Sequence, residues 1–102
     1  HYSIDDPSSA AQAYVQAYKS EYGLTPDAMA VLGYDAVYLL VDAIKRANST
    51  DPQAIRAALE KTENFPALSG DITLNATHDA IKSAVIIEMK EGKQVYKATI
   101  KP

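Results

Sequence analysis

The sequence of 102 residues contains no cysteine, no tryptophan and only one phenylalanine. Without cysteine there can be no disulfide, no thiolate metal site and no cysteine nucleophile. No apolar run approaches the roughly 18 residues that a membrane-spanning helix needs. We also expect no signal peptide in these residues, because no charged segment is followed by an apolar core. These absences exclude disulfide-stabilised scaffolds, cysteine-based catalysis and a spanning helix.

Basic charge is also in short supply. The chain has 10 basic and 13 acidic residues, which gives a net charge of −3. Its first 51 residues hold 3 basic against 7 acidic side chains, and the remainder holds 7 against 6. Neither half could neutralise a run of phosphates, so we expect no nucleic-acid partner. Hydrophobic residues make up 47%, as in a globular chain with room for one core.

Tyrosine is plentiful, with seven copies. Tyr14, Tyr18 and Tyr22 recur every four residues, which predicts one face of a helix over about 7–22. Asp6-Pro7 predicts the start of this helix, and Gly23 its end. Tyrosine favours half-wet surfaces, so these rings border either a cleft or the edge of a core.

A second helix is predicted from the start signal Thr25-Pro26-Asp27 to about Ala47. Its apolar positions surround most of the helix, which therefore needs cover on more than one side. Those positions are Met29, Leu32, Ala36, Leu39, Leu40, Ala43, Ile44 and Ala47. Gly33 lies among them, which indicates either close packing against another backbone or room for a ligand. We favour packing.

Two carboxylates seven positions apart, Asp35 and Asp42, share one face of this helix. Such a pair could do acid–base work. The nearby Lys45 and Arg46 would neutralise it, so a solvated helix face is the favoured interpretation.

The second half of the chain changes from helical to alternating periodicity. The predicted elements are a helix from Pro52 to about Lys61, a short strand at 72–74, a turn at 75–79, a strand over 83–90 and its partner over 95–100. Glu91-Gly92 is a tight-turn signal for a hairpin. The predicted class is α/β: three helices, a short strand and a C-terminal β-hairpin. Because this sheet is small, we expect the main sheet to lie outside these residues.

No motif for catalysis, a metal or a cofactor is present. His1 and His78 lie far apart, and neither has the histidine partner that a zinc-binding helix needs. The isolated glycines form no phosphate-binding loop, and no serine lies in a nucleophile-elbow sequence. We therefore predict no enzyme, no metal site and no cofactor, and we expect both histidines to be solvated.

Several segments together are similar to a known family. They are Asp5-Asp6-Pro7, Tyr14-x3-Tyr18-x3-Tyr22-Gly23, Pro26-Asp27-Ala28-Met29-Ala30, Gly33-Tyr34-Asp35-Ala36, Ala43-Ile44-Lys45-Arg46-Ala47, Asp51 to Leu59 and Gly70-Asp71-Ile72-Thr73-Leu74. In this order and spacing they resemble the C-terminal third of type I periplasmic binding proteins. The nearest branch is the leucine/isoleucine/valine-binding, or extracellular ligand-binding receptor, group of ABC importers.

The resemblance implies two α/β lobes joined by three crossing segments, with ligand bound between the lobes. Residues 1–80 would be the end of the N-terminal lobe, and 81–102 the third crossing with a hairpin of the C-terminal lobe. Met29 stands where the family often has a phenylalanine that packs on the ligand side chain. Tyr34 is a second ligand-binding candidate. The family segments that bind the ligand's amino and carboxylate groups have no counterpart here.

The implied function is capture of a branched-chain or other small amino acid, or a related metabolite, by hinge closure. Its parent would be secreted or lipid-anchored, in the periplasm or otherwise outside the cytoplasm, with an ABC permease as partner. One alternative is a ligand-sensing receptor domain of the same fold, although Lys101-Pro102 resembles a natural chain end and favours the transport protein. Another alternative is an independent helical module that self-associates. If the chain is only these residues, we expect a homo-oligomer.

Overall fold

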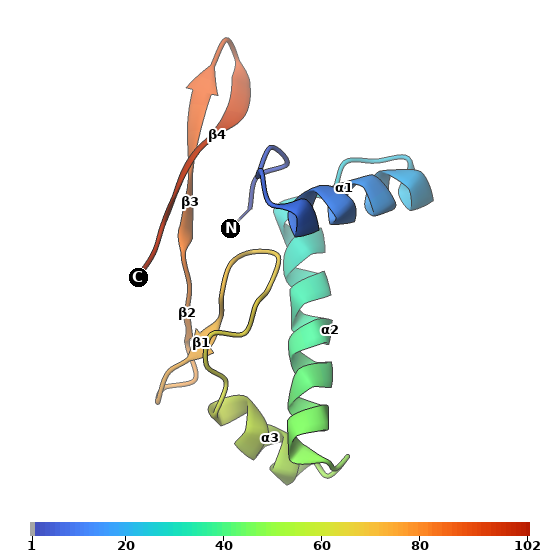
Figure 1. Ribbon diagram of the computed structural model, residues 1–102, viewed down its shortest axis with the longest axis vertical. Coiled ribbons are helices and arrows are strands. Elements are labelled where there is room, and N and C mark those ends of the chain that lie inside the picture. Colours follow the sequence, from blue (N-terminus) through green and yellow to red (C-terminus); the bar gives the residue numbers. More distant parts are fainter. Residues whose placement is uncertain (1) are drawn as a thin grey trace.

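The computed structural model describes residues 2–102, and it separates three helices from a long hairpin (Figure 1). Its elements are α1 (Ser9–Tyr22), α2 (Ala28–Ala47), α3 (Pro52–Glu60), β1 (Thr73–Leu74), β2 (Ala80–Ile81), β3 (Ala84–Lys90) and β4 (Lys93–Ile100). The prediction that His1 is solvated concerns a residue outside the described range. The chain measures 50 × 32 × 19 Å, and its radius of gyration of 15.3 Å exceeds the roughly 13 Å of a compact domain this size.

The helix boundaries follow from capping side chains. Asp27 accepts a hydrogen bond from the Ala30 amide at 2.8 Å, and Asp51 accepts one from the Ala54 amide at 2.9 Å. These bonds satisfy amides that the first helical turn leaves without partners. Gly23 ends α1 in the left-handed conformation, and its N–H donates to the Lys19 carbonyl. The predicted extents of the second and third helices are confirmed to within one or two residues.

The start of α1 differs from the prediction. Its cap is Ser8, whose hydroxyl accepts from the Ala11 amide at 3.3 Å. Asp6 instead accepts from the Ser8 amide at 2.8 Å, which makes a local turn before the helix. The helix therefore begins two residues later than predicted, because serine also caps well and stands closer to the apolar face.

The strands form two separate antiparallel pairs. In the first, Thr73 pairs with Ile81 and Leu74 with Ala80, around the turn predicted at 75–79. The strand β2 was not predicted, because two residues are too few to show a period. The hairpin β3–β4 was predicted, and its turn residues Glu91 and Gly92 both have positive φ, as a type I′ turn requires. Within the described residues no larger sheet is present.

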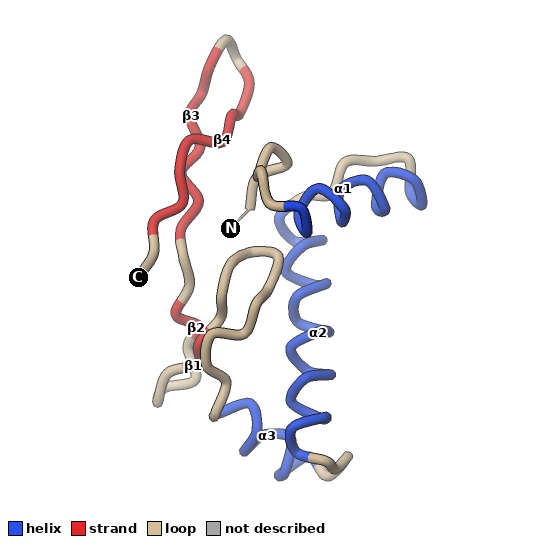
Figure 2. The backbone as a smooth tube through the Cα atoms, viewed as in Figure 1, coloured by secondary structure: helices blue, strands red, loops and turns tan. Residues whose placement is uncertain are grey.

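Figure 2 shows a long loop between α3 and β1, lying between the helices and the strands. Phe65 and Ile72 close it by exchanging both backbone hydrogen bonds, each 2.9 Å long. This closure brings the loop segment 67–70 beside α2. The loop is thus an ordered part of the fold.

The core is small. Tyr2, Val15 and Val31 are buried together, with Tyr14 and Leu68 packed against them. At the other end of α2, the Arg46 guanidinium donates to the Ala58 carbonyl at 2.5 Å and to the Thr62 hydroxyl at 3.0 Å, which ties α3 to α2. Both ends of α2 are therefore covered on one side only.

The opposite side of α2 is apolar and open. We call Met29, Gly33, Val37, Leu40 and Val41 the open face; its four large side chains are each at least 41% exposed. A Cβ added at Gly33 would meet no atom within 4 Å, so the packing expected around this glycine is not found in residues 2–102. The sequence predicted that this helix needs cover on more than one side. The exposed apolar surface agrees with that prediction, because residues 2–102 cover only one side of the helix.

Candidate ligand site and its supporting contacts

Met29, the first predicted site residue, lies in the first turn of α2. Its side chain is 72% exposed, because it points away from the core side of the helix. The N-cap Asp27 fixes this turn through its bond to the Ala30 amide. Met29 is thus a flexible apolar side chain presented on a well-anchored helix end, which suits contact with an apolar ligand group.

Tyr34, the second predicted site residue, lies in a row of tyrosine rings rather than beside Met29. Its ring centroid is 4.9 Å from that of Tyr14 and 4.5 Å from that of Tyr38. The row continues along α1 through Tyr18 and Tyr22. These stacked rings join α1 to α2 at their exposed edge. Of the two interpretations left open by the sequence, this arrangement favours the edge of a core for this row.

The pKa values of Tyr34, Tyr14 and Tyr2 are raised above the usual value for tyrosine. Side-chain hydrogen bonding with Tyr38, followed by burial, raises the pKa of Tyr34 to about 12. Burial is also the main cause that raises the pKa of Tyr14 and of Tyr2. The Tyr2 hydroxyl donates to the Pro26 carbonyl at 3.1 Å, so its proton has a structural role.

These pKa values predict an alkaline loss of stability. An unfolded tyrosine ionises near pH 10, whereas folded Tyr34 holds its proton to about pH 12. The stabilising contribution is therefore complete below pH 10 and is lost as the pH rises from 10 to 12. Ultraviolet titration of the phenolates should show a late-ionising tyrosine that Tyr34→Phe removes. Tyr38→Phe should return that ionisation toward pH 10, while the control Tyr96→Phe should not; a Tyr34 titration unmoved by Tyr38→Phe would contradict this.

A cavity of about 430 Å³ lies beside the start of α2, between the helices and the hairpin. It is lined by Tyr2, Ser3, Ile4, Thr25, Pro26, Asp27, Ala28, Ile87 and Gln94. Its walls come from both sides of the molecule, since Ile87 and Gln94 belong to the hairpin. Neither Met29 nor Tyr34 lines this cavity, so the structure does not bring the two predicted site residues together in it.

Asp35 is buried, which corrects the expectation of a solvated helix face. It is 3% exposed, and its carboxylate accepts hydrogen bonds from the Leu68 amide at 2.8 Å and the Ser69 amide at 3.0 Å. The Ser69 hydroxyl donates to the same carboxylate. A carboxylate can be buried when several donors replace its water. Asp35 thus fastens loop segment 67–70 to α2.

Asp42 behaves as expected from the sequence. It pairs with Arg46 at 2.7 Å, and both side chains remain more than a third exposed. The two carboxylates of this helix therefore have separate partners and separate surroundings. Nothing in their geometry brings them together on one substrate.

Lys82 reaches the same polar group from the strand side. Its ammonium donates to the Ser69 hydroxyl, which is also bonded to Asp35. Burial lowers the pKa of Lys82, and the charge of Asp35 opposes that shift. Ser69 and Lys82 were not predicted as functional residues, because no local sequence pattern marks them. Their bonds join residues 13 and 34 positions apart.

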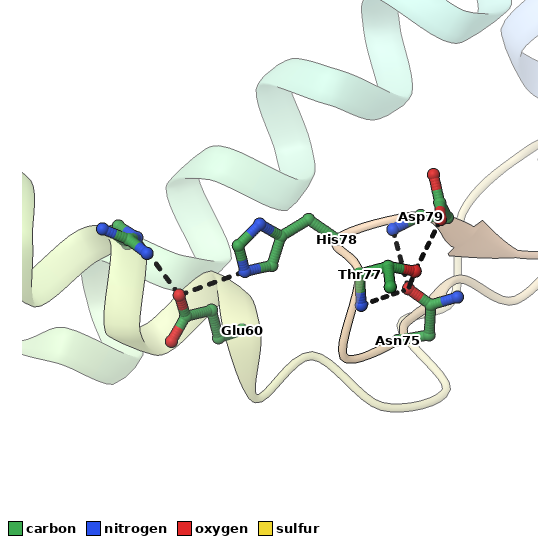
Figure 3. A network of polar contacts seen from close by, with 6 residues as sticks. Glu60, Asn75, Thr77, His78 and Asp79 are labelled. Carbon is green, nitrogen blue, oxygen red and sulfur yellow. Dashed lines mark hydrogen bonds and ion pairs between the residues drawn. The ribbon is translucent and has the colours of Figure 1, made fainter.

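A second polar group links the end of α3 to the turn between β1 and β2 (Figure 3). Glu60 accepts from Arg56 at 3.1 Å and lies 3.2 Å from His78. Within the turn, the Asn75 side chain accepts from the amides of Thr77 and Asp79. His78 is more than half exposed, as expected, and here it stands beside a carboxylate. This group is a surface contact that stabilises the turn.

Residues 2–102 contain no cluster of three or more side chains suited to holding a metal. No helix among these residues combines the length and hydropathy needed to cross a membrane.

A family model described as "Periplasmic binding protein" matches residues 1–94. The chain belongs to this family. The resemblance predicted from the sequence is therefore confirmed.

Periplasmic binding proteins that are similar to the chain include a curated relative and solved structures. "Leu/Ile/Val-binding protein homolog 2" of Brucella abortus is 31% identical over 72 residues, which cover 70% of this chain and 19% of the relative. The leucine binding protein LivK of Thermotoga maritima is 42% identical to this chain, and its structure matches with a TM-score of 0.82. The match covers 100% of this chain and 29% of LivK.

A third relative carries a different ligand. The solute binding protein of an ABC transporter from Rhodopseudomonas palustris, in complex with 3,4-dihydroxybenzoic acid, is 28% identical with a TM-score of 0.81. The matched region covers 98% of this chain and 29% of the Rhodopseudomonas palustris protein. The chain thus has the α/β fold of one part of a two-lobed type I periplasmic binding protein, and it spans less than a third of these relatives.

Proposed function

We propose that the chain is part of a solute-binding protein that delivers a branched-chain or other small amino acid, or a related metabolite, to an ABC importer. The observation that carries this proposal is the likeness to LivK, which extends over the whole chain. The relatives described above are binding proteins, and none of their names supports a sensor domain or an independent helical module. The chain would make or break no bond in its ligand.

The proposed mechanism is closure of two lobes around the ligand. Residues 1–80 would end the N-terminal lobe, and residues 81–102 would supply the third crossing and a hairpin of the other lobe. In support, the hairpin β3–β4 extends away from α2 and α3 (Figure 1), and it directly follows the segment at about 80–83 that would be the third crossing. Ligand that binds both lobes would shift the population toward the closed form.

A permease in the membrane would be the partner of the complete protein. Its location would then be periplasmic or otherwise extracytoplasmic, since an importer receives its solute from outside the cell. The family supports this location.

Calorimetry on the complete gene product tests the function. We expect leucine to bind at micromolar or tighter affinity and to be recovered unchanged. The 102 residues alone should bind leucine far more weakly, because they lack the segments that hold the amino and carboxylate groups. The aromatic acid 3,4-dihydroxybenzoate is the comparison ligand, because a relative with 28% identity binds it. Binding of neither class to the complete protein would contradict the proposal.

Met29 and Tyr34 are the proposed ligand contacts, with Met29 the stronger of the two. Truncating Met29 to alanine removes apolar surface that the bound ligand would cover. A buried methionine side chain is worth about 1.5–3 kcal/mol, so the affinity for leucine should fall about 10-fold or more. Met89→Ala is the matched control, because this methionine is similarly exposed on the hairpin. Equal affinities for the two variants would remove Met29 from the site.

A further inference from the structure

Three separate parts of the chain meet at one polar group. Asp35 comes from the middle of α2, Ser69 from loop segment 67–70, and Lys82 from the crossing between β2 and β3. The Ser69 hydroxyl donates to the Asp35 carboxylate and accepts from the Lys82 ammonium. Through this hydroxyl, the chain links its longest helix to the crossing.

Burial makes these bonds costly to lose. Asp35 and Ser69 are both 3% exposed, and Lys82 is half-buried. Donors from the loop take the place of water around the carboxylate, and Lys82 supplies a positive charge next to them. A hydrogen bond to a charged group is stronger than one between neutral groups, and a buried one is not replaced by water.

The Ser83 side chain, which also belongs to the crossing, lies near the same loop segment. A Cβ added at Gly70 would lie 3.6 Å from the Cβ of Ser83. Gly70 also has a φ of +100°, a conformation that disfavours other residues. Lys82 and Ser83 lie between the two strand pairs and belong to neither. Among the described contacts, the crossing is therefore held to loop segment 67–70 by the Lys82 hydrogen bond and by packing of Ser83 near Gly70.

We propose that Asp35, Ser69 and Lys82 form a tether that fixes the crossing to α2 and sets how far the two lobes open. The three are positioning residues and need not touch the ligand. The role in opening rests on the proposed function, whereas the tether itself does not. If Lys82 loses its ammonium, the crossing gains freedom, and the ligand-free protein populates wider openings.

Hydrogen exchange on the complete, ligand-free protein tests the tether. Ser69→Ala and Lys82→Met should each raise the exchange rate of the Leu68 and Ser69 amides about tenfold, because both amides donate to the carboxylate that these residues hold in place. Lys93→Met makes the same change at an exposed hairpin position and should leave these rates unaltered. The tether would be overturned if the Leu68 and Ser69 amides exchanged no faster in Ser69→Ala and Lys82→Met than in Lys93→Met.

Energy transfer between two dyes tests the effect on opening. The described chain has no cysteine, so Gln53→Cys on α3 and Met89→Cys on the hairpin provide labelling sites. Without leucine, Lys82→Met should shift the distribution of dye separations toward wider openings, and Lys82→Arg should restore the original distribution because it keeps a cationic donor. Identical distributions in all three proteins would overturn the role in opening. If leucine leaves the unsubstituted protein unchanged, the proposed function fails, while the exchange rates still decide the tether.

Discussion

Replacing Asp35 with alanine is expected to lower the free energy of unfolding by about 3–5 kcal/mol, which is typical for the loss of one partner from a buried charged group. The substitution leaves the Leu68 and Ser69 amides and the Ser69 hydroxyl without their acceptor. It also removes the nearby negative charge that favours the half-buried ammonium of Lys82. Urea denaturation of the complete protein gives the free energy directly.

Asp42→Ala is the control on the same helix. Among residues 2–102, Asp42 pairs with Arg46 alone, and their side chains are 38% and 35% exposed. Water can replace much of this interaction, so Asp42→Ala should lower the free energy of unfolding by at most about 1 kcal/mol. Equal losses for the two variants would contradict the structural distinction drawn between these carboxylates. A larger loss at Asp42 than at Asp35 would reverse it.

The contrast between these two aspartates shows what the sequence could predict. Arg46 follows Asp42 by one helical turn, so their pairing is visible in the spacing. The donors to Asp35 lie 33 and 34 positions away, and no local pattern points to them. The sequence therefore predicted a polar stripe correctly at one carboxylate and wrongly at the other.

The helices and strands show the same difference between local and distant interactions. Helices were predicted nearly to their ends, because Asp27, Asp51 and Gly23 act within one turn. The hairpin was predicted from alternation and its turn. In contrast, β2 consists of two residues whose pairing depends on the turn that precedes them. The tether depends on tertiary contacts and could not be predicted, and the ligand roles of Met29 and Tyr34 stay predictions.

The open face of α2 provides the other large expected effect. Leu40→Lys should cost the complete protein about 3 kcal/mol or more, because a neighbouring β-layer would then bury the new charge without a partner. In the 102 residues alone Leu40 is 44% exposed, so the same change should cost little within one copy. There we expect the open faces of two copies to associate, since an apolar surface of this extent is seldom left in water.

Light scattering separates these two environments. The 102 residues should form dimers or larger species at micromolar concentration, and Leu40→Lys should return them to monomers. Ala13→Lys on α1 is the control, since it adds the same charge at an exposed position away from the open face. A compact, stable monomer of the unsubstituted 102 residues would refute self-association. A complete protein that tolerates Leu40→Lys as easily as Ala13→Lys would show that no β-layer covers α2, and the proposed place of this helix in a lobe would then be wrong.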